Sequence, residues 1–259
     1  MKHVRFRDPA GAVRQGEWID AGRNTAGDDL VGHGGRVAFG GRSYEVGEVD
    51  VLPPVAPSKI VCVGLNYADH ADERDSEVPD RPKLFLKPPN AVASHGSEIV
   101  LPAETERVDY EAELGVVVDR QCRDVDAAEA LEFVRGYTCV VDVSNRDDQS
   151  VEQNWVRGKA FDNAAPLGPV VADPEHVPAD ADVELRLNGE VRQSSSRDQL
   201  IFPVPALIEE ITTYLTLEPG DVIATGTPAG VGPLSPDDTV EVSVEGVGTL
   251  RHTVAADRP

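Results

Sequence analysis

Three carboxylates stand at the ends of apolar runs, where a chain commonly begins or ends a buried strand. Glu111 and Glu113 precede the apolar residues 114–118, and Asp142 closes the run 138–141. Residues i and i+2 of a strand share a face, so the two glutamates would point the same way. Like charges so placed repel and are costly to bury, and a divalent cation that prefers oxygen ligands would remove that cost. The spacing indicates either a site for a hard divalent cation (Mg²⁺, Mn²⁺ or Ca²⁺) or ordinary surface acids.

A pair suited to proton transfer follows the apolar run 60–64. His70 and Glu73 are three residues apart, so on a helix they share one face, and the carboxylate can accept a hydrogen bond from the imidazole. Histidine changes charge near neutral pH, which suits a general base. The alternative for such a pair is an exposed histidine beside acids on a polar loop.

Two lysines and a glycine-rich loop offer groups for an anion. Lys87 follows an apolar run and precedes two prolines, and Lys159 ends the tripeptide 157–159. Lysine in a partly desolvated site can stabilise a carboxylate or an oxyanion, although ordinary surface charge explains either lysine better in isolation. The loop 225–232, which contains Thr227, can present N–H groups and a hydroxyl to an anion, or it can form only a structural turn.

The composition narrows the class of protein. The 259 residues include 46 acids against 24 lysines and arginines, a formal charge of −22, which argues against nucleic acid and anionic membranes as partners. Only five of these cations are lysines, and an acidic, lysine-poor surface of halophilic type suits a protein hydrated in high salt. The three cysteines, Cys62, Cys122 and Cys139, lack paired metal spacing, so we expect inert thiols. No apolar run approaches a membrane span, and we expect a cytoplasmic protein.

The elements that must position these residues are mostly strands. Short strand signals between Gly and Asp turns predict a small β-rich N-terminal domain over residues 1–52, the prolines of 53–57 predict a linker, and the catalytic domain is expected over 58–259. Strands outnumber helices, which indicates an α+β, β-dominated fold with a mixed sheet. The individual elements that the pattern predicts are helices over 126–135 and 205–215, a buried strand over 60–64, and hairpins around Asn188-Gly189 and Gly246-Val247-Gly248.

Taken in order over residues 58–254, these segments resemble the fumarylacetoacetate hydrolase family. No single motif is specific, but the ordered set is. The motifs that carry the resemblance are Gly64-Leu65-Asn66-Tyr67-Ala68-Asp69-His70, Leu84-Phe85-Leu86-Lys87-Pro88, Asp109-Tyr110-Glu111-Ala112-Glu113-Leu114, Asp142-Val143-Ser144-Asn145-Arg146-Asp147-Asp148-Gln149, Arg157-Gly158-Lys159, Pro166-Leu167-Gly168-Pro169, Asn188-Gly189-Glu190 and Thr225-Gly226-Thr227-Pro228-Ala229-Gly230-Val231-Gly232.

The resemblance implies a C-terminal domain of rolled mixed β-sheet in a homodimer, with one Mg²⁺ or Mn²⁺ per chain. The residues to which it assigns roles are Glu111, Glu113 and Asp142 as metal ligands, His70 and Glu73 as the catalytic pair, Lys159 as the stabiliser of oxyanion charge, and Lys87, Gln149 and Thr227 as contacts of the substrate.

The implied activity is cleavage of carbon–carbon bonds in short 2-oxo acids such as acylpyruvates, or decarboxylation of oxaloacetate. His70, oriented by Glu73, would deprotonate a water that attacks the distal carbonyl, and a pyruvate enolate would leave. An isomerase or decarboxylase of 2-hydroxyhepta-2,4-diene-1,7-dioate is the alternative, and its second carboxylate would need Arg74 or Arg157 near the lid. A catalytically silent, ligand-binding member of the same fold is a third possibility.

Overall fold

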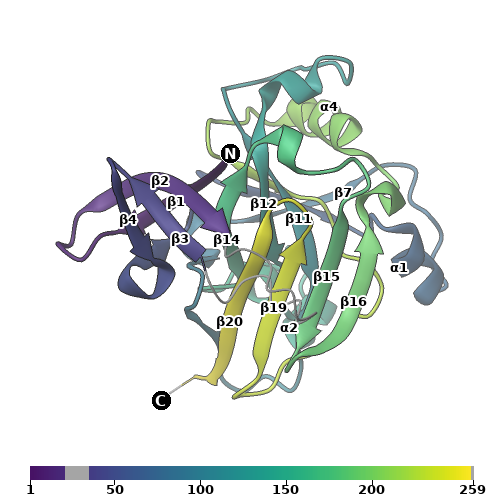
Figure 1. The fold of residues 1–259 in the computed structure, drawn as a ribbon. Helices are drawn as coiled ribbons and strands as arrows, with labels where there is room; N and C mark the ends of the chain where they lie inside the picture. The colour runs from purple at the N-terminus through teal and green to yellow at the C-terminus, as the bar shows by residue number, and fades with distance from the viewer. Residues whose placement is uncertain (21–34, 258–259) are drawn as a thin grey trace.

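The computed structural model describes residues 1–20 and 35–257, and three β-sheets dominate the secondary structure of that part of the chain (Figure 1). Both parallel and antiparallel pairs occur, since β17 (Val222–Ala224) pairs antiparallel with β11 (Ala112–Val118) and parallel with β6 (Ile60–Gly64). The predicted α+β, strand-dominated class is therefore confirmed.

The largest sheet contains the two neighbouring strands at whose ends the candidate metal ligands lie. In spatial order its strands are β4 (Arg42–Glu45), β3 (Gly35–Phe39), β2 (Val13–Asp20), β1 (Lys2–Arg7), β14 (Ala165–Ala172), β12 (Val134–Val141), β11, β17, β6 and β7 (Lys83–Lys87), while β5 (Asp50–Leu52) pairs with β1 and β8 (Val92–Ala93) with β14.

A five-stranded sheet and a three-stranded sheet complete the strand architecture of the described residues. The five strands, in spatial order, are β16 (Glu190–Ser196), β15 (Asp182–Leu187), β19 (Thr239–Val244), β20 (Gly248–Ala256) and β9 (Glu98–Leu101), and the three are β13 (Ser144–Asn145), β10 (Val108–Tyr110) and β18 (Gly232–Pro233).

The helices are short, apart from α4. The α-helices are α1 (Ala68–Glu73), α2 (Arg146–Val151), α3 (Val156–Lys159) and α4 (Val204–Tyr214), and the 3₁₀ turns are η1 (Val46–Glu48), η2 (Pro89–Ala91), η3 (Ala130–Phe133), η4 (Pro174–His176) and η5 (Arg197–Gln199). None of the helices in the described residues is long and apolar enough to cross a membrane.

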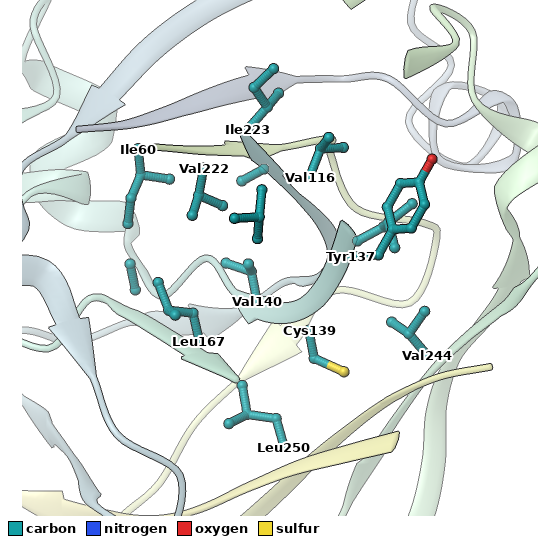
Figure 2. Close-up of a cluster of buried hydrophobic side chains, with 14 of the residues drawn as sticks. Ile60, Val116, Tyr137, Cys139, Val140, Leu167, Val222, Ile223, Val244 and Leu250 are labelled. Atoms are coloured by element: carbon teal, nitrogen blue, oxygen red, sulfur yellow. The ribbon is translucent and has the colours of Figure 1, made fainter. Parts of the chain in front are cut away.

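The main core lies where the five-stranded sheet packs against the large one. In β11 every residue is buried, as expected for a strand covered on both faces, whereas β19 alternates and buries only one face. Figure 2 shows Val140 and Leu167 of the large sheet in one cluster with Leu250 of β20. The three cysteines are free and buried, as the sequence predicts.

Some predicted elements are confirmed. The helix expected over 205–215 is α4, with Pro203 at its N-cap. Asn188 and Gly189, both at positive φ (55° and 82°), form the two-residue turn between β15 and β16. The hairpin around Gly246-Val247-Gly248 joins β19 to β20.

The prediction of a helix over residues 126–135 is wrong. Only a 3₁₀ turn forms there, and β12 begins at Val134, which is buried, while Leu131 is exposed. Gly136 lies inside β12, where a Cβ would collide with the carbonyl oxygen of Ala172. The local pattern favoured a helix, but the pairing of β12 with both β11 and β14 outweighs that preference.

The N-terminal strands continue the large sheet, because β1 pairs with β14 as well as with β2. The division into residues 1–52, 53–57 and 58–259 stays a prediction. Residues 21–34 and 258–259, which belong to the first and last of these predicted units, lie outside the described residues.

Candidate active site

Strand pairing brings the three predicted metal ligands together. Glu111 precedes β11, Glu113 lies within it, and Asp142 directly follows β12. The antiparallel register opposes Ala112 to Val141, and the backbone N–H of Asp142 donates to the carbonyl of Glu111 at 2.8 Å. Each of the three carboxylates is buried and offers an oxygen that lies within 4.8 Å of the others.

Lys159 stands against two of these carboxylates. Its ammonium nitrogen donates to Glu111 Oε2 at 2.8 Å, to Asp142 Oδ2 at 2.6 Å and to Ser144 Oγ at 2.5 Å. Burial alone would lower the pKa of Lys159, but the charges of Asp142 and Glu111 more than offset it and raise that pKa. Burial would likewise raise the pKa of Glu111, which the charges of Lys159 and Arg146 instead hold below its usual range. Glu111 is therefore anionic at neutral pH.

Glu113 has no ion pair with a lysine or arginine in the described residues. Burial, and then the charges of Asp142 and Glu111, raise its pKa well above the usual range, and the N–H of Gly226, at 2.9 Å, offsets this only in part. A cation among the three acids would remove that penalty, and an oxygen-only ligand set suits Mg²⁺ or Mn²⁺. These residues therefore fit the divalent metal that the sequence predicts.

Lys87 lies behind the carboxylates and does not line the cavity beside them. Its fully buried ammonium donates to the carbonyls of Val143, Lys159 and Ala164 at 3.1, 2.6 and 2.8 Å. It also lies 2.7 Å from Asp142 Oδ1. Because Lys87 is fully buried and is not part of the cavity lining, it stabilises the backbone and Asp142 beneath the cavity, and this geometry does not support its predicted contact with the substrate.

A cavity of about 620 Å³ opens over the carboxylates. Its lining includes most of the residues that the sequence predicts for the site, namely His70, Glu111, Glu113, Asp142, Gln149, Lys159 and Thr227. Its lining also includes the exposed side chains of Arg74 and Lys83 and the half-buried rings of Phe85 and Trp155. Arg157, one of the two arginines considered for a second carboxylate, is not part of the lining and pairs with Glu152 at 3.2 Å.

The predicted catalytic pair is formed on α1. His70 Nδ1 lies 3.0 Å from Glu73 Oε2, and the N–H of Gly230 donates to Glu73 Oε1 at 3.1 Å. Buried Asn66 anchors the start of α1 by donating to the carbonyl of Thr225 at 2.7 Å. With Nδ1 donating to the carboxylate, Nε2 is the ring nitrogen left to accept a proton. The pair therefore has the arrangement of an oriented general base.

Helices α2 and α3 carry Gln149 and Lys159 to the site. The side chain of Asn145 caps α2 by accepting from the N–H groups of Asp147 and Asp148, which favours a helix directly after β13. The helix α3 passes so close to α2 that a Cβ at Gly158 would lie 3.0 Å from the backbone of Gln149. The glycine before Lys159 is thus required by helix packing.

Sequence reasoning missed Arg146 and Gln193. Arg146 donates to Asp109 Oδ2 at 2.8 Å, to Gln149 Oε1 at 2.7 Å and to Glu111. The sequence offered one indication of the role of Arg146, which is its position between Asp142 and Gln149 in a segment rich in acids. Gln193, from β16, accepts from the N–H of Ala112 at 2.9 Å and donates to Thr227 Oγ1 at 2.9 Å. Nothing in its local sequence indicates this role.

A second group of potential ligands, Asp173, Glu175 and His176, also has donor atoms within 4.8 Å of one another. Glu175 and His176 are exposed, and Asp173 is engaged with His3 at 2.7 Å. Exposed acids commonly gather without a metal, so this group carries less weight than the buried one.

Residues 59–255 match the family model described as fumarylacetoacetate (FAA) hydrolase C-terminal. The chain belongs to the fumarylacetoacetate hydrolase family. The family resemblance predicted from the ordered motifs is thereby confirmed.

Members of the fumarylacetoacetate hydrolase family with several activities are similar to the chain. An oxaloacetate tautomerase of Bacillus subtilis is 38% identical, over 88% of this chain and 83% of that protein. The crystal structure of a 5-carboxymethyl-2-hydroxymuconate delta-isomerase from Mycobacterium smegmatis superposes with a TM-score of 0.86 at 38% identity, covering 100% of both chains. The structure of a fumarylpyruvate hydrolase from Pseudomonas aeruginosa with Mn²⁺ and pyruvate has a TM-score of 0.72 at 32% identity, covering 81% of this chain and 92% of that one.

Proposed function

We propose that the protein is a Mg²⁺- or Mn²⁺-dependent enzyme that cleaves carbon–carbon bonds of short 2-oxo acids, acylpyruvates or oxaloacetate among them, through an enolate. The observation that carries the proposal is that one cavity joins the three buried carboxylates to the His70–Glu73 pair. Oxygen ligands and a proton acceptor on one cavity are the groups that enolate chemistry requires. The Mn²⁺ and pyruvate bound by the Pseudomonas aeruginosa relative support the proposal.

The chain supplies binding, orientation and proton transfer. A metal held by Glu111, Glu113 and Asp142 would contribute Lewis-acid stabilisation of negative charge on the substrate oxygens. Gln149 and Thr227 line the cavity, where their side chains can hydrogen-bond to the substrate.

The His70–Glu73 pair on α1 carries out proton transfer, and Lys159 stabilises negative charge. With an acylpyruvate, His70 takes a proton at Nε2 from a water that attacks the distal carbonyl, while Glu73 holds the ring and stabilises the imidazolium. The imidazolium then gives this proton to the departing pyruvate enolate. The buried ammonium of Lys159 lies at the carboxylates and stabilises oxyanion charge as the bond breaks.

Isomerisation or tautomerisation of the same class of acid is the second candidate. It is favoured by the similarity to the Bacillus subtilis tautomerase and the Mycobacterium smegmatis isomerase. Both reactions move a proton beside a carbonyl and stabilise the same enolate charge, so His70 and Lys159 serve them without an attacking water. A catalytically silent binding member fits less well, because it does not need an oriented base beside buried acids.

A substrate panel tests the proposal. Acylpyruvates, oxaloacetate and 2-hydroxyhepta-2,4-diene-1,7-dioate should be assayed in high salt with Mg²⁺, Mn²⁺ or EDTA. We expect metal-dependent cleavage of at least one acid, and a loss of about 10²–10⁴-fold in His70→Ala. The matched control is His176→Ala, whose exposed ring lies outside the cavity and should leave turnover unchanged. Turnover of none of these acids, or equal turnover in EDTA, would contradict the proposal.

The homodimer stays a prediction, and light scattering would test it.

A further inference from the structure

The outer wall of the cavity carries cations without acidic partners. Arg74 and Lys83 line the cavity, yet neither forms a salt bridge among the described residues. The contrast with Arg146 and Lys159, which are paired with acids deeper in the same cavity, is sharp in a chain that has 46 acids for 24 basic residues. A cation left unpaired on the wall of a binding cavity is available to an anionic ligand.

Lys83 is held in place by an aromatic wall. Its ammonium lies 4.0 Å from the ring centroid of Trp155, and the rings of Trp155 and Phe85 pack edge to face with centroids 5.4 Å apart. Lys83 and Phe85 are two residues apart on β7 and share a face of that strand. Contact with the ring restricts the rotamers of the Lys83 side chain. The side chain therefore loses less conformational entropy when an anion binds to it.

The same wall reaches the metal-ligand end of the cavity. The ammonium of Lys159, which contacts Glu111 and Asp142, lies 5.1 Å from the centroid of Phe85. The two lysines therefore stand against different rings of one wall, Lys159 at the carboxylates and Lys83 at the outer part. A substrate whose 2-oxo acid end lies at the metal ligands and whose second anionic group lies at Lys83 would have a carbon chain that runs along Phe85 and Trp155.

We propose that Lys83 is a specificity-determining residue that binds a second carboxylate, at the end of the substrate remote from its 2-oxo acid group. The proposal rests on the proposed function, because the 2-oxo acid end is placed at the metal ligands. Two aromatic rings separate the lysines, so the preferred substrate is a dicarboxylic 2-oxo acid with a chain longer than the four carbons of oxaloacetate. An acid without the distal carboxylate gains nothing from Lys83.

The test compares two unreactive acids of equal chain length, 2-oxopimelate and 2-oxoheptanoate, which differ in the distal carboxylate. Titration calorimetry in the presence of Mn²⁺ should show that the wild type binds 2-oxopimelate at least tenfold more tightly. Lys83→Met keeps the aliphatic stem against Trp155 and removes the charge, so it should abolish the preference, and Lys83→Arg should restore most of it. The matched control is Arg157→Met, because Arg157 is exposed and does not line the cavity.

Several outcomes would overturn the assignment of Lys83. These are a wild type that binds both acids equally or neither of them, and a Lys83→Met variant that keeps the preference or weakens both acids alike. The test separates this proposal from the proposed function: a wild type that prefers 2-oxopimelate but turns over no acid of the panel would refute the function and leave the Lys83 site standing.

Discussion

Replacing Lys87 by methionine distinguishes a structural lysine from a substrate contact. The change leaves the carbonyls of Val143, Lys159 and Ala164 without their donor and Asp142 Oδ1 without its ion partner, all of them in the floor of the site. Breaking a buried ion pair by removing one partner costs about 3–5 kcal/mol. For a chain of this size each kcal/mol lowers the melting temperature by about 2–4 °C, so we expect a decrease of roughly 10 °C.

Urea unfolding followed by tryptophan fluorescence measures this cost as a lower midpoint at an unchanged m value. Lys83→Met is the matched control, because Lys83 is an exposed residue of the same strand and loses only its contact with the Trp155 ring, so the free energy of unfolding should change by less than about 1 kcal/mol. A Lys87→Met protein of wild-type stability with a much raised KM would refute the reasoning. Lys87 would then contact the substrate, as the sequence alone suggested.

Two further substitutions test the catalytic pair and a buried histidine. Glu73→Gln removes the charge but keeps an acceptor for His70 Nδ1, so in steady-state assays it should lower kcat by less than the roughly 10²–10⁴-fold expected for His70→Ala, with KM nearly unchanged. An unchanged kcat would mean that the charge of Glu73 does not stabilise the imidazolium. Burial lowers the pKa of His252 to about 4, so the folded state binds fewer protons than the unfolded state below about pH 6.5, and stability falls as the pH falls toward 4. His252→Gln should reduce the loss of unfolding free energy between pH 7.5 and 4.5 by about 2–3 kcal/mol, measured by urea unfolding; an equal loss in both proteins would contradict the assignment.

The clustering of Glu111, Glu113 and Asp142 could be predicted from the sequence because the information is local. A carboxylate at the start of one buried strand and another at the end of the next come together whenever the two strands pair antiparallel, as β11 and β12 do. The turn at Asn188-Gly189 was predictable for a similar reason, since the positive φ values that a two-residue hairpin needs favour these residue types.

The features that the sequence did not predict correctly depend on tertiary contacts. Residues 126–135 have a helical pattern, but Val134 and Gly136 belong to a strand held by β11 and β14. Lys83 and Lys87 occupy one face of one strand, and only the fold decides that Lys87 is buried while Lys83 is exposed. Gln193 reaches Ala112 and Thr227 from β16, a pairing of distant segments that no local motif encodes.

The central claim is that Glu111, Glu113 and Asp142 hold one divalent metal. The most direct measurement is calorimetric titration of the EDTA-treated, dialysed protein with Mn²⁺, for the wild type and Glu113→Gln, together with thermal melts of both. Glu113→Gln keeps the size of the side chain and removes its charge, and Glu175→Gln, in the exposed group with Asp173 and His176, is the matched control.

We predict one Mn²⁺ per chain in the wild type and in Glu175→Gln, with a stabilisation of about 2.7 kcal/mol at a hundred times the dissociation constant. Glu113→Gln should lose most of the binding and most of that stabilisation. Equal binding by the wild type and Glu113→Gln would show that Glu113 is not a ligand, and a wild type that binds no Mn²⁺ and shows no thermal shift would contradict the metal site itself.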